Sequence, residues 1–257
     1  MHIINFNEKN LPVEDLETIG LAAGGQLLLN VDDLKALLSG RRTGLLQLQN
    51  LEAENIRIKS MDAKVSLKED ENGKVNLLIH PVYKKPRTPS FLDDNEALKL
   101  EKGDVANYLK TTTDDKGNKK EILVEYDKET REFIVSDTEK ILAPDMVNLQ
   151  FLTPAQKDAY RKGREVTLPD KTTFSYSATD SHSIRANKLA LVASILIDGG
   201  LTYVIYKGLN TLFNQKRDEN DAAKLSPGYY HAVQDAENQQ PRTPNQMTRS
   251  YTRTGSR

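Results

Sequence analysis

A sequence motif that occurs twice constrains the fold of this chain more than any other feature. A Phe-Leu pair followed by a Lys-Gly pair appears in two copies sixty residues apart, as Phe91-Leu92 with Lys102-Gly103 and as Phe151-Leu152 with Lys162-Gly163. A repeated motif of this kind indicates one supersecondary unit that is built more than once. The chain is therefore expected to contain the same small unit twice.

Each copy carries the signals of one short helix. The residues of a capping box are followed by a glycine that favours the left-handed end of a helix: Asp93, Glu96 and Gly103 in the first copy, Thr153, Gln156 and Gly163 in the second. Further on, Tyr126 and Ile134 correspond to Tyr176 and Ile184 at an offset of fifty, because the first copy has a longer hairpin tip. We expect each copy to be a helix followed by two or three antiparallel strands.

The first 85 residues have a different pattern. Leu16 marks a first short helix, and Asn30 and Gly40 are suited to start and end a second one. Apolar and polar residues then alternate from Ile56 to Leu67, as in a half-buried strand, and Val75–Ile79 reads as its antiparallel partner. The alternation sets Arg57, Lys59, Lys64 and Ser66 on the face opposite the apolar side chains. Two helices on a small sheet are predicted.

The only strongly apolar stretch is 189–213. Nine Leu, Ile or Val residues lie between Leu189 and Tyr206, and Asp198-Gly199-Gly200 interrupts them. On an insertion scale the apolar residues contribute roughly −3 to −5 kcal/mol and Asp198 costs about 2.5 to 3.5 kcal/mol, so a membrane span is marginal. We expect an apolar helical hairpin that is buried or at an interface, with membrane insertion as the alternative. The candidate partner or membrane contacts are Leu201, Val204, Ile205, Leu212 and Asp198.

Charge and composition narrow the function classes. The 36 basic and 37 acidic residues balance, so the chain as a whole has no net attraction for nucleic acid or anionic lipid. The polar tail, 214–257, is expected to be disordered, and its last part contains four arginines without an acidic residue. Weak contact with nucleic acid is an alternative for these side chains, Arg242, Arg249, Arg253 and Arg257.

The residues that usually carry catalysis are not grouped in this sequence. There is no cysteine, the four histidines are far apart, and no glycine-rich loop precedes a Lys-Ser or Lys-Thr pair. The N-terminal residues lack the apolar segment of a cleavable signal peptide. We expect a protein that is not an enzyme, without a cofactor or metal, in the cytoplasm or associated with a membrane.

Several of these motifs resemble known families. Leu37-Leu38-Ser39-Gly40-Arg41-Arg42-Thr43, with a hairpin that ends in His80-Pro81-Val82, is similar to domain-of-unknown-function family 4099. The repeated Phe-Leu and Lys-Gly pairs, and the stretch Ile184–Leu191, resemble the companion family 3945. Such proteins are typical of Bacteroides-type conjugative or integrative elements. The resemblance implies an accessory role on a mobile element, without catalytic residues to carry over.

Together these observations predict an α+β chain. The expected parts are an N-terminal α+β domain (1–85), a linker (86–90), two tandem modules (91–150 and 151–188), the apolar segment (189–213) and the tail (214–257). We expect a non-catalytic accessory or adaptor protein that binds a protein partner or itself. Two alternatives stay open, a membrane-associated component of a conjugative transfer apparatus and a DNA-binding accessory that uses the arginine-rich tail.

Overall fold

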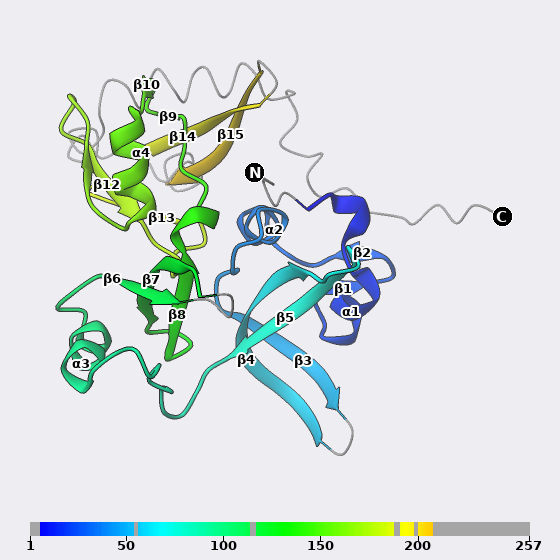
Figure 1. The fold of residues 1–257 in the computed structure, drawn as a ribbon. Helices are drawn as coiled ribbons and strands as arrows, with labels where there is room; N and C mark the ends of the chain where they lie inside the picture. Colours follow the sequence, from blue (N-terminus) through cyan, green and yellow to red (C-terminus); the bar gives the residue numbers. More distant parts are fainter. Residues whose placement is uncertain (1–5, 54–55, 114–116, 188–190, 198–199, 208–257) are drawn as a thin grey trace, which may run out of the picture. The chain divides into compact units, whose positions relative to one another are not determined.

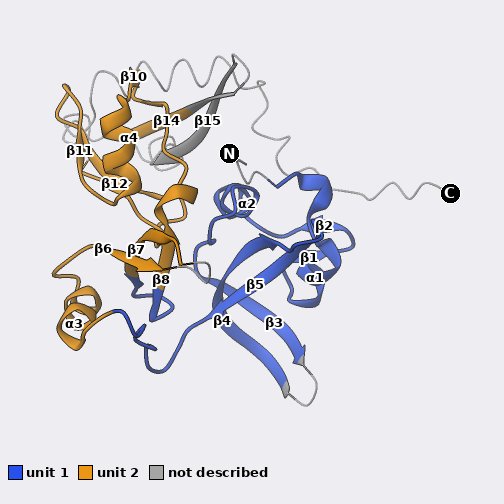
Figure 2. Ribbon diagram, in the orientation of Figure 1, with its two compact units in different colours: residues 1–91, 126–133, 243–257 blue, residues 92–125, 134–242 orange. Residues whose placement is uncertain are grey.

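The computed structural model describes residues 6–53, 56–113, 117–187, 191–197 and 200–207 (Figure 1). These residues form short helices and antiparallel sheets, which confirms the α+β class. The chain divides into two compact units (Figure 2). Among the described residues, unit 1 contains those up to Phe91 and also Tyr126–Phe133, and unit 2 contains 92–125 and 134–207.

Unit 1 begins with helices and continues as a three-stranded antiparallel sheet in the order β3-β4-β5. Asn30 caps the second helix, because its side chain accepts a hydrogen bond from the backbone N–H of Asp33. One apolar core holds the helices against the sheet, with Leu16, Leu37 and Val65 fully buried. The elements are η1 (Glu8–Asn10), α1 (Val13–Thr18), β1 (Ala22–Ala23), β2 (Gln26–Leu27), α2 (Val31–Leu38), β3 (Leu46–Ala53), β4 (Ile56–Glu69) and β5 (Val75–Pro81).

Strand β4 is buried on both faces at its centre. Ala63, Val65 and Leu67 point into the apolar core of unit 1, as the alternation in the sequence predicts. Lys64 and Ser66, on the opposite face, are also buried, with 2% and 7% of their surface exposed. A charged residue is almost never buried without a partner, so the polar face of β4 must be covered by groups that pair with Lys64.

Each copy of the repeated motif forms a helix followed by a three-stranded antiparallel sheet. Unit 2 contains both copies except for Phe91 and Tyr126–Phe133 of the first, which belong to unit 1. Both predicted capping boxes are present, and Gly103 ends the first helix in the left-handed conformation. The first copy consists of α3 (Asp94–Lys102), β6 (Tyr108–Thr113), β7 (Lys119–Asp127) and β8 (Glu132–Asp137). The second consists of α4 (Pro154–Arg161), β11 (Val166–Thr167), β12 (Thr173–Tyr176) and β13 (Ile184–Ala186), and η2 (Thr138–Lys140), β9 (Met146–Val147) and β10 (Gln150–Phe151) lie between them.

The two copies share one apolar core within unit 2. Leu123 of the first copy lies in the same cluster as Tyr160 and Phe174 of the second. The end of α4 fits closely against the first copy. A Cβ atom on Gly163 would lie 2.7 Å from the side-chain amide nitrogen of Asn107 and 2.8 Å from a methyl carbon of Leu123. With its φ of +66°, this position requires glycine both for backbone conformation and for space.

The apolar segment 189–213 was predicted to be helical, and this prediction is wrong for the residues that the structure describes there. They form the antiparallel pair β14 (Leu191–Ile197) and β15 (Gly200–Lys207). Its many β-branched and aromatic residues favour strands, and β9 supplies a pairing edge in the sheet β10-β9-β14-β15. Leu191 and Ala193 are thereby buried in the core of unit 2. None of the helices described here is long and apolar enough to cross a membrane.

Candidate functional site

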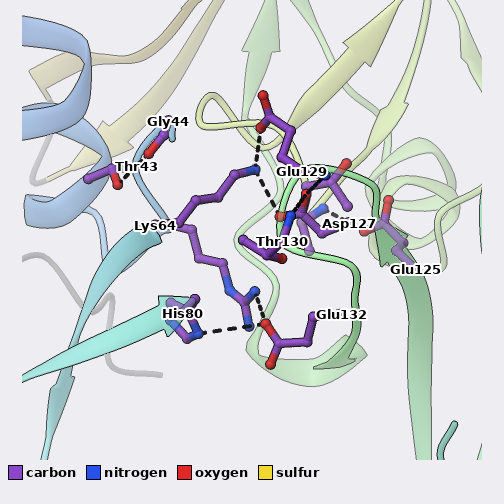
Figure 3. A network of polar contacts seen from close by, with 12 residues as sticks. Thr43, Gly44, Lys64, His80, Glu125, Asp127, Glu129, Thr130 and Glu132 are labelled. Carbon is purple, nitrogen blue, oxygen red and sulfur yellow. Dashed lines mark hydrogen bonds and ion pairs between the residues drawn. The ribbon is translucent and has the colours of Figure 1, made fainter. Parts of the chain in front are cut away.

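The covered face of β4 carries the most unusual polar arrangement in the described residues of unit 1. The ammonium group of Lys64 lies 2.8 Å from Oδ2 of Asp127 and 2.8 Å from Oε2 of Glu129 (Figure 3). The Lys64 and Asp127 side chains are each 2% exposed, whereas Glu129 is 58% exposed. Asp127 is therefore the buried partner of the lysine, and Glu129 is its solvent-exposed partner.

The loop that brings these carboxylates to Lys64 joins β7 to β8. Oδ1 of Asp127 accepts hydrogen bonds from the backbone N–H groups of Glu129 (3.0 Å) and Thr130 (3.4 Å), which folds the loop around this side chain. Arg131 completes the turn with a φ of +56°. The backbone N–H of Tyr83, just after β5, donates to the carbonyl of Thr130 at 2.9 Å. One carboxylate thus shapes the loop with one oxygen and binds β4 with the other.

A second branch of the network is centred on Glu132. Nη1 of Arg42 donates to Oε2 of Glu132 at 2.6 Å, and Nδ1 of His80 lies 3.8 Å from the same oxygen. On β4, Oγ of Ser66 lies 2.8 Å from Nε2 of His80. The turn after α2 holds Arg42 in place, because the next residue, Thr43, forms hydrogen bonds to the backbone of β4 with both its N–H and its hydroxyl group.

Electrostatics keep His80 neutral at physiological pH. Burial lowers the pKa of His80 from 6.5 to about 4, and the nearby Arg42 charge contributes to this lowering. The carboxylates of Glu132 and Asp127 oppose this shift but do not outweigh it. His80, on β5, therefore serves as a neutral hydrogen-bonding group toward Ser66 on β4.

The order Ser66, His80, Glu132 resembles the hydroxyl, imidazole and carboxylate of a nucleophilic triad, but its properties differ from those that catalysis needs. A general base works best with a pKa near the working pH, and that of His80 is about 4. The carboxylate is 3.8 Å from the ring, which is too far for a hydrogen bond, and only 7% of Ser66 is exposed. The geometry is that of an anchor between strands.

Unit 2 has a comparable buried charge at Glu125 on β7, with 1% of its surface exposed. Its carboxylate accepts hydrogen bonds from the hydroxyl group of Ser177 at 3.0 Å and from the backbone N–H of Ala178. The guanidinium group of Arg185 lies 3.7 Å away. These three groups belong to the loop after β12 and to β13, so a strand of the first copy holds the corresponding loop of the second copy.

The candidate contacts predicted from the sequence are only partly placed by the structure. Leu201, Val204 and Ile205 lie on β15, and the positions of their side chains are outside the described residues. Asp198, Leu212 and the four arginines Arg242, Arg249, Arg253 and Arg257 also lie outside them.

Sequence reasoning missed Lys64, Asp127 and Glu125 as buried groups. Lys64 was recognised as a member of the polar face of a strand, and such a face is ordinarily solvated. Asp127 reads as the start of a turn, which is its local role. The sequence did contain a signal for Glu125. It directly follows three consecutive apolar residues, Ile122, Leu123 and Val124, and such a run is typical of a strand that is buried on both faces.

Comparison with known proteins identifies a family match in the N-terminal part. Residues 6–90 match the family described as "Protein of unknown function (DUF4099)", which supports the resemblance of this part. No curated protein and no solved structure matches the chain. The matched segment ends before Asp127, Glu129 and Glu132, so the groups that pair with Lys64 and Arg42 come from outside it.

Proposed function

We propose that this chain is a non-catalytic adaptor of a mobile DNA element that acts through protein–protein contacts. The resemblance of its motifs to proteins of conjugative and integrative elements supports the setting. The observation that carries the adaptor role is the environment of the repeated Phe-Leu pair. Leu92 and Leu152 are both buried, at 6% exposure, whereas Phe91 and Phe151 are 38% and 67% exposed.

An aromatic side chain that both copies keep at least partly outside the core is available for contact with a partner. Burying a phenylalanine contributes roughly 1.5–3 kcal/mol, so leaving it in water forgoes a large stabilisation. Aromatic residues are enriched at the centres of protein interfaces, where they anchor the partner. The two exposed phenylalanines therefore fit contact positions for a protein partner.

A hydrogen-bonded hairpin turn positions the backbone that carries Phe151. Phe151 pairs with Met146 in the β9–β10 hairpin, and Asn148 and Leu149 form its two-residue turn with φ of +49° and +63°. A leucine rarely adopts this conformation, which costs roughly 1–2 kcal/mol. Asn148 fixes the turn through two hydrogen bonds with the backbone of Val192. Leu149, in the same hairpin, is 38% exposed and adds a second exposed apolar side chain.

The proposal is tested by affinity purification of the tagged full chain from its native host, with quantitative mass spectrometry. We expect Phe151→Ser and Phe91→Ser to reduce recovery of the same protein partner by at least about tenfold, the loss expected when an anchor worth roughly 1.5–3 kcal/mol is removed. Val135→Ser is the matched control, since Val135 is 46% exposed and lies outside the repeated pair. Equal partner recovery for all three variants would contradict the proposal.

A further inference from the structure

The two units use one device to hold a hairpin loop. In unit 1, Lys64 on β4 binds the loop that begins at Asp127. In unit 2, Glu125 on β7 binds the loop that begins at Ser177. Asp127 and Ser177 are equivalent positions of the repeat, because each directly follows the tyrosine of its copy, Tyr126 or Tyr176. In both units a buried side chain of an ionisable residue on a strand contacts the residue that follows the tyrosine.

The charges of the two contacts are opposite. In unit 1 the strand carries a lysine, which forms ion pairs with the carboxylates of Asp127 and Glu129. In unit 2 the strand carries a carboxylate, which accepts hydrogen bonds from the hydroxyl group of Ser177 and the backbone N–H of Ala178. Arg185 adds a positive charge on the same side. Exchanging the two loops would remove the favourable pairing in both units. Ser177 has no charge to neutralise Lys64, and Asp127 would lie against the buried carboxylate of Glu125.

The face of β7 that holds Glu125 is a continuous docking surface for the second copy. Residues 121, 123 and 125 alternate along the strand and therefore lie on one face. Glu121 lies 3.3 Å from the ammonium group of Lys162, and Leu123 packs against Gly163. Lys162 and Gly163 are the repeated Lys-Gly pair, so the docking surface binds the helix end and the loop of the same copy.

We propose that the residue after the module tyrosine, together with the charge on the strand it meets, determines which strand each module docks on. A carboxylate at this position selects a strand that carries lysine, and a hydroxyl group followed by a backbone N–H donor selects a strand that carries glutamate. Mispairing would leave a buried charge without a partner or bring two like charges together, and both are strongly unfavourable. This proposal goes beyond the adaptor role and does not depend on it.

The test transfers the lysine–aspartate pair of unit 1 into unit 2 of the full chain. Glu125→Lys and Ser177→Asp are made singly and together, and hydrogen exchange of the backbone amides of residues 177–183 is measured by mass spectrometry. Each single change brings like charges together, because the introduced lysine would face Arg185 and the introduced aspartate would face Glu125. We therefore expect exchange to accelerate by on the order of tenfold or more. The double variant re-forms an ion pair, and its exchange rate should return to within about threefold of the unmodified chain.

A control separates this effect from that of any new charge in the loop. Ser181→Asp makes the same substitution where the hydroxyl contacts His182 instead of Glu125, and we expect little change. A double variant that exchanges as fast as the worse single variant would overturn the proposal, and so would a Ser177→Asp variant that behaves like Ser181→Asp.

A milder pair of changes keeps the test decisive if a charged variant does not fold. Ser177→Ala and Glu125→Gln remove the contact without adding charge, and the double variant should exchange no faster than the faster single variant. Fully additive effects would overturn the proposal. Because Phe91 and Phe151 are unchanged in every variant, failure of this proposal and failure of the adaptor role are read separately.

Discussion

Replacing Lys64 with methionine removes the ammonium group from the covered face of β4 and keeps most of the side-chain volume. Asp127, 2% exposed, is then left buried without its cation, whereas Glu129, 58% exposed, remains solvated. Removal of one partner from a buried ion pair costs about 3–5 kcal/mol, and loss of an exposed pair costs roughly 0–1 kcal/mol. The expected destabilisation is therefore about 3–5 kcal/mol and comes almost entirely from Asp127.

A double variant identifies the source of this loss. Asp127→Asn keeps an oxygen for the backbone N–H groups of Glu129 and Thr130 but removes the charge. Combined with Lys64→Met, it leaves no buried ion in this pair, so the double variant should lose less stability than the two single changes added together. Urea unfolding of the full chain at pH 7, followed by circular dichroism, measures all three variants.

The matched control is Arg57→Met, because Arg57 forms an ion pair of 2.7 Å with Glu52 on the same sheet. Their side chains are 77% and 58% exposed, so this pair should contribute no more than about 1 kcal/mol. If Lys64→Met lowered the free energy of unfolding no more than Arg57→Met does, the reasoning about the buried network would be refuted.

Three further predictions concern other parts of the chain. The pKa of His80 is about 4 in the folded chain and near 6.5 in the unfolded chain, so the unfolded chain binds more protons between these values and the folded state should lose stability as the pH falls from 6.5 to 4. In urea unfolding across this range, His80→Gln should lose about 1–3 kcal/mol less free energy of unfolding than the unmodified chain. The same pH profile for both proteins would contradict this prediction. Gly163→Ala should destabilise the protein more than Gly24→Ala, because both glycines have positive φ but only Gly163 has atoms within 3 Å of the new Cβ; equal urea midpoints would contradict this. Phe151→Ser should change the free energy of unfolding by no more than about 0.5 kcal/mol, since the side chain is 67% exposed, and a larger loss in urea unfolding would show that it supports the fold.

Local signals in the sequence were sufficient for the helices of both repeats. The capping boxes at Asp93 and Thr153 and the left-handed glycines Gly103 and Gly163 are determined by residues within one or two turns of helix, so propensity and hydrogen bonding alone identify them. The cap at Asn30 is of the same kind. The ends of these helices are set by residues close to them in the chain, so they can be predicted from the sequence.

The features that sequence reasoning missed depend on contacts between distant segments. The run that contains Leu191–Ile197 is apolar enough for a buried helix or a strand, and only its pairing with β9 decides between them. The polar face of β4 looks solvated until the loop at Asp127 covers it. Neither the register of the strands nor the partner of a buried charge is encoded within a few residues, so both required the structure.

The most direct test of the adaptor role is a photo-crosslinking amino acid placed at position 151 of the full chain, with position 135 as the control. Both side chains are well exposed, but only Phe151 belongs to the repeated pair. In cells of the native host, we expect irradiation to join one protein partner to position 151 and not to position 135. Crosslinking that is absent at 151, or equal at the two positions, would contradict the account.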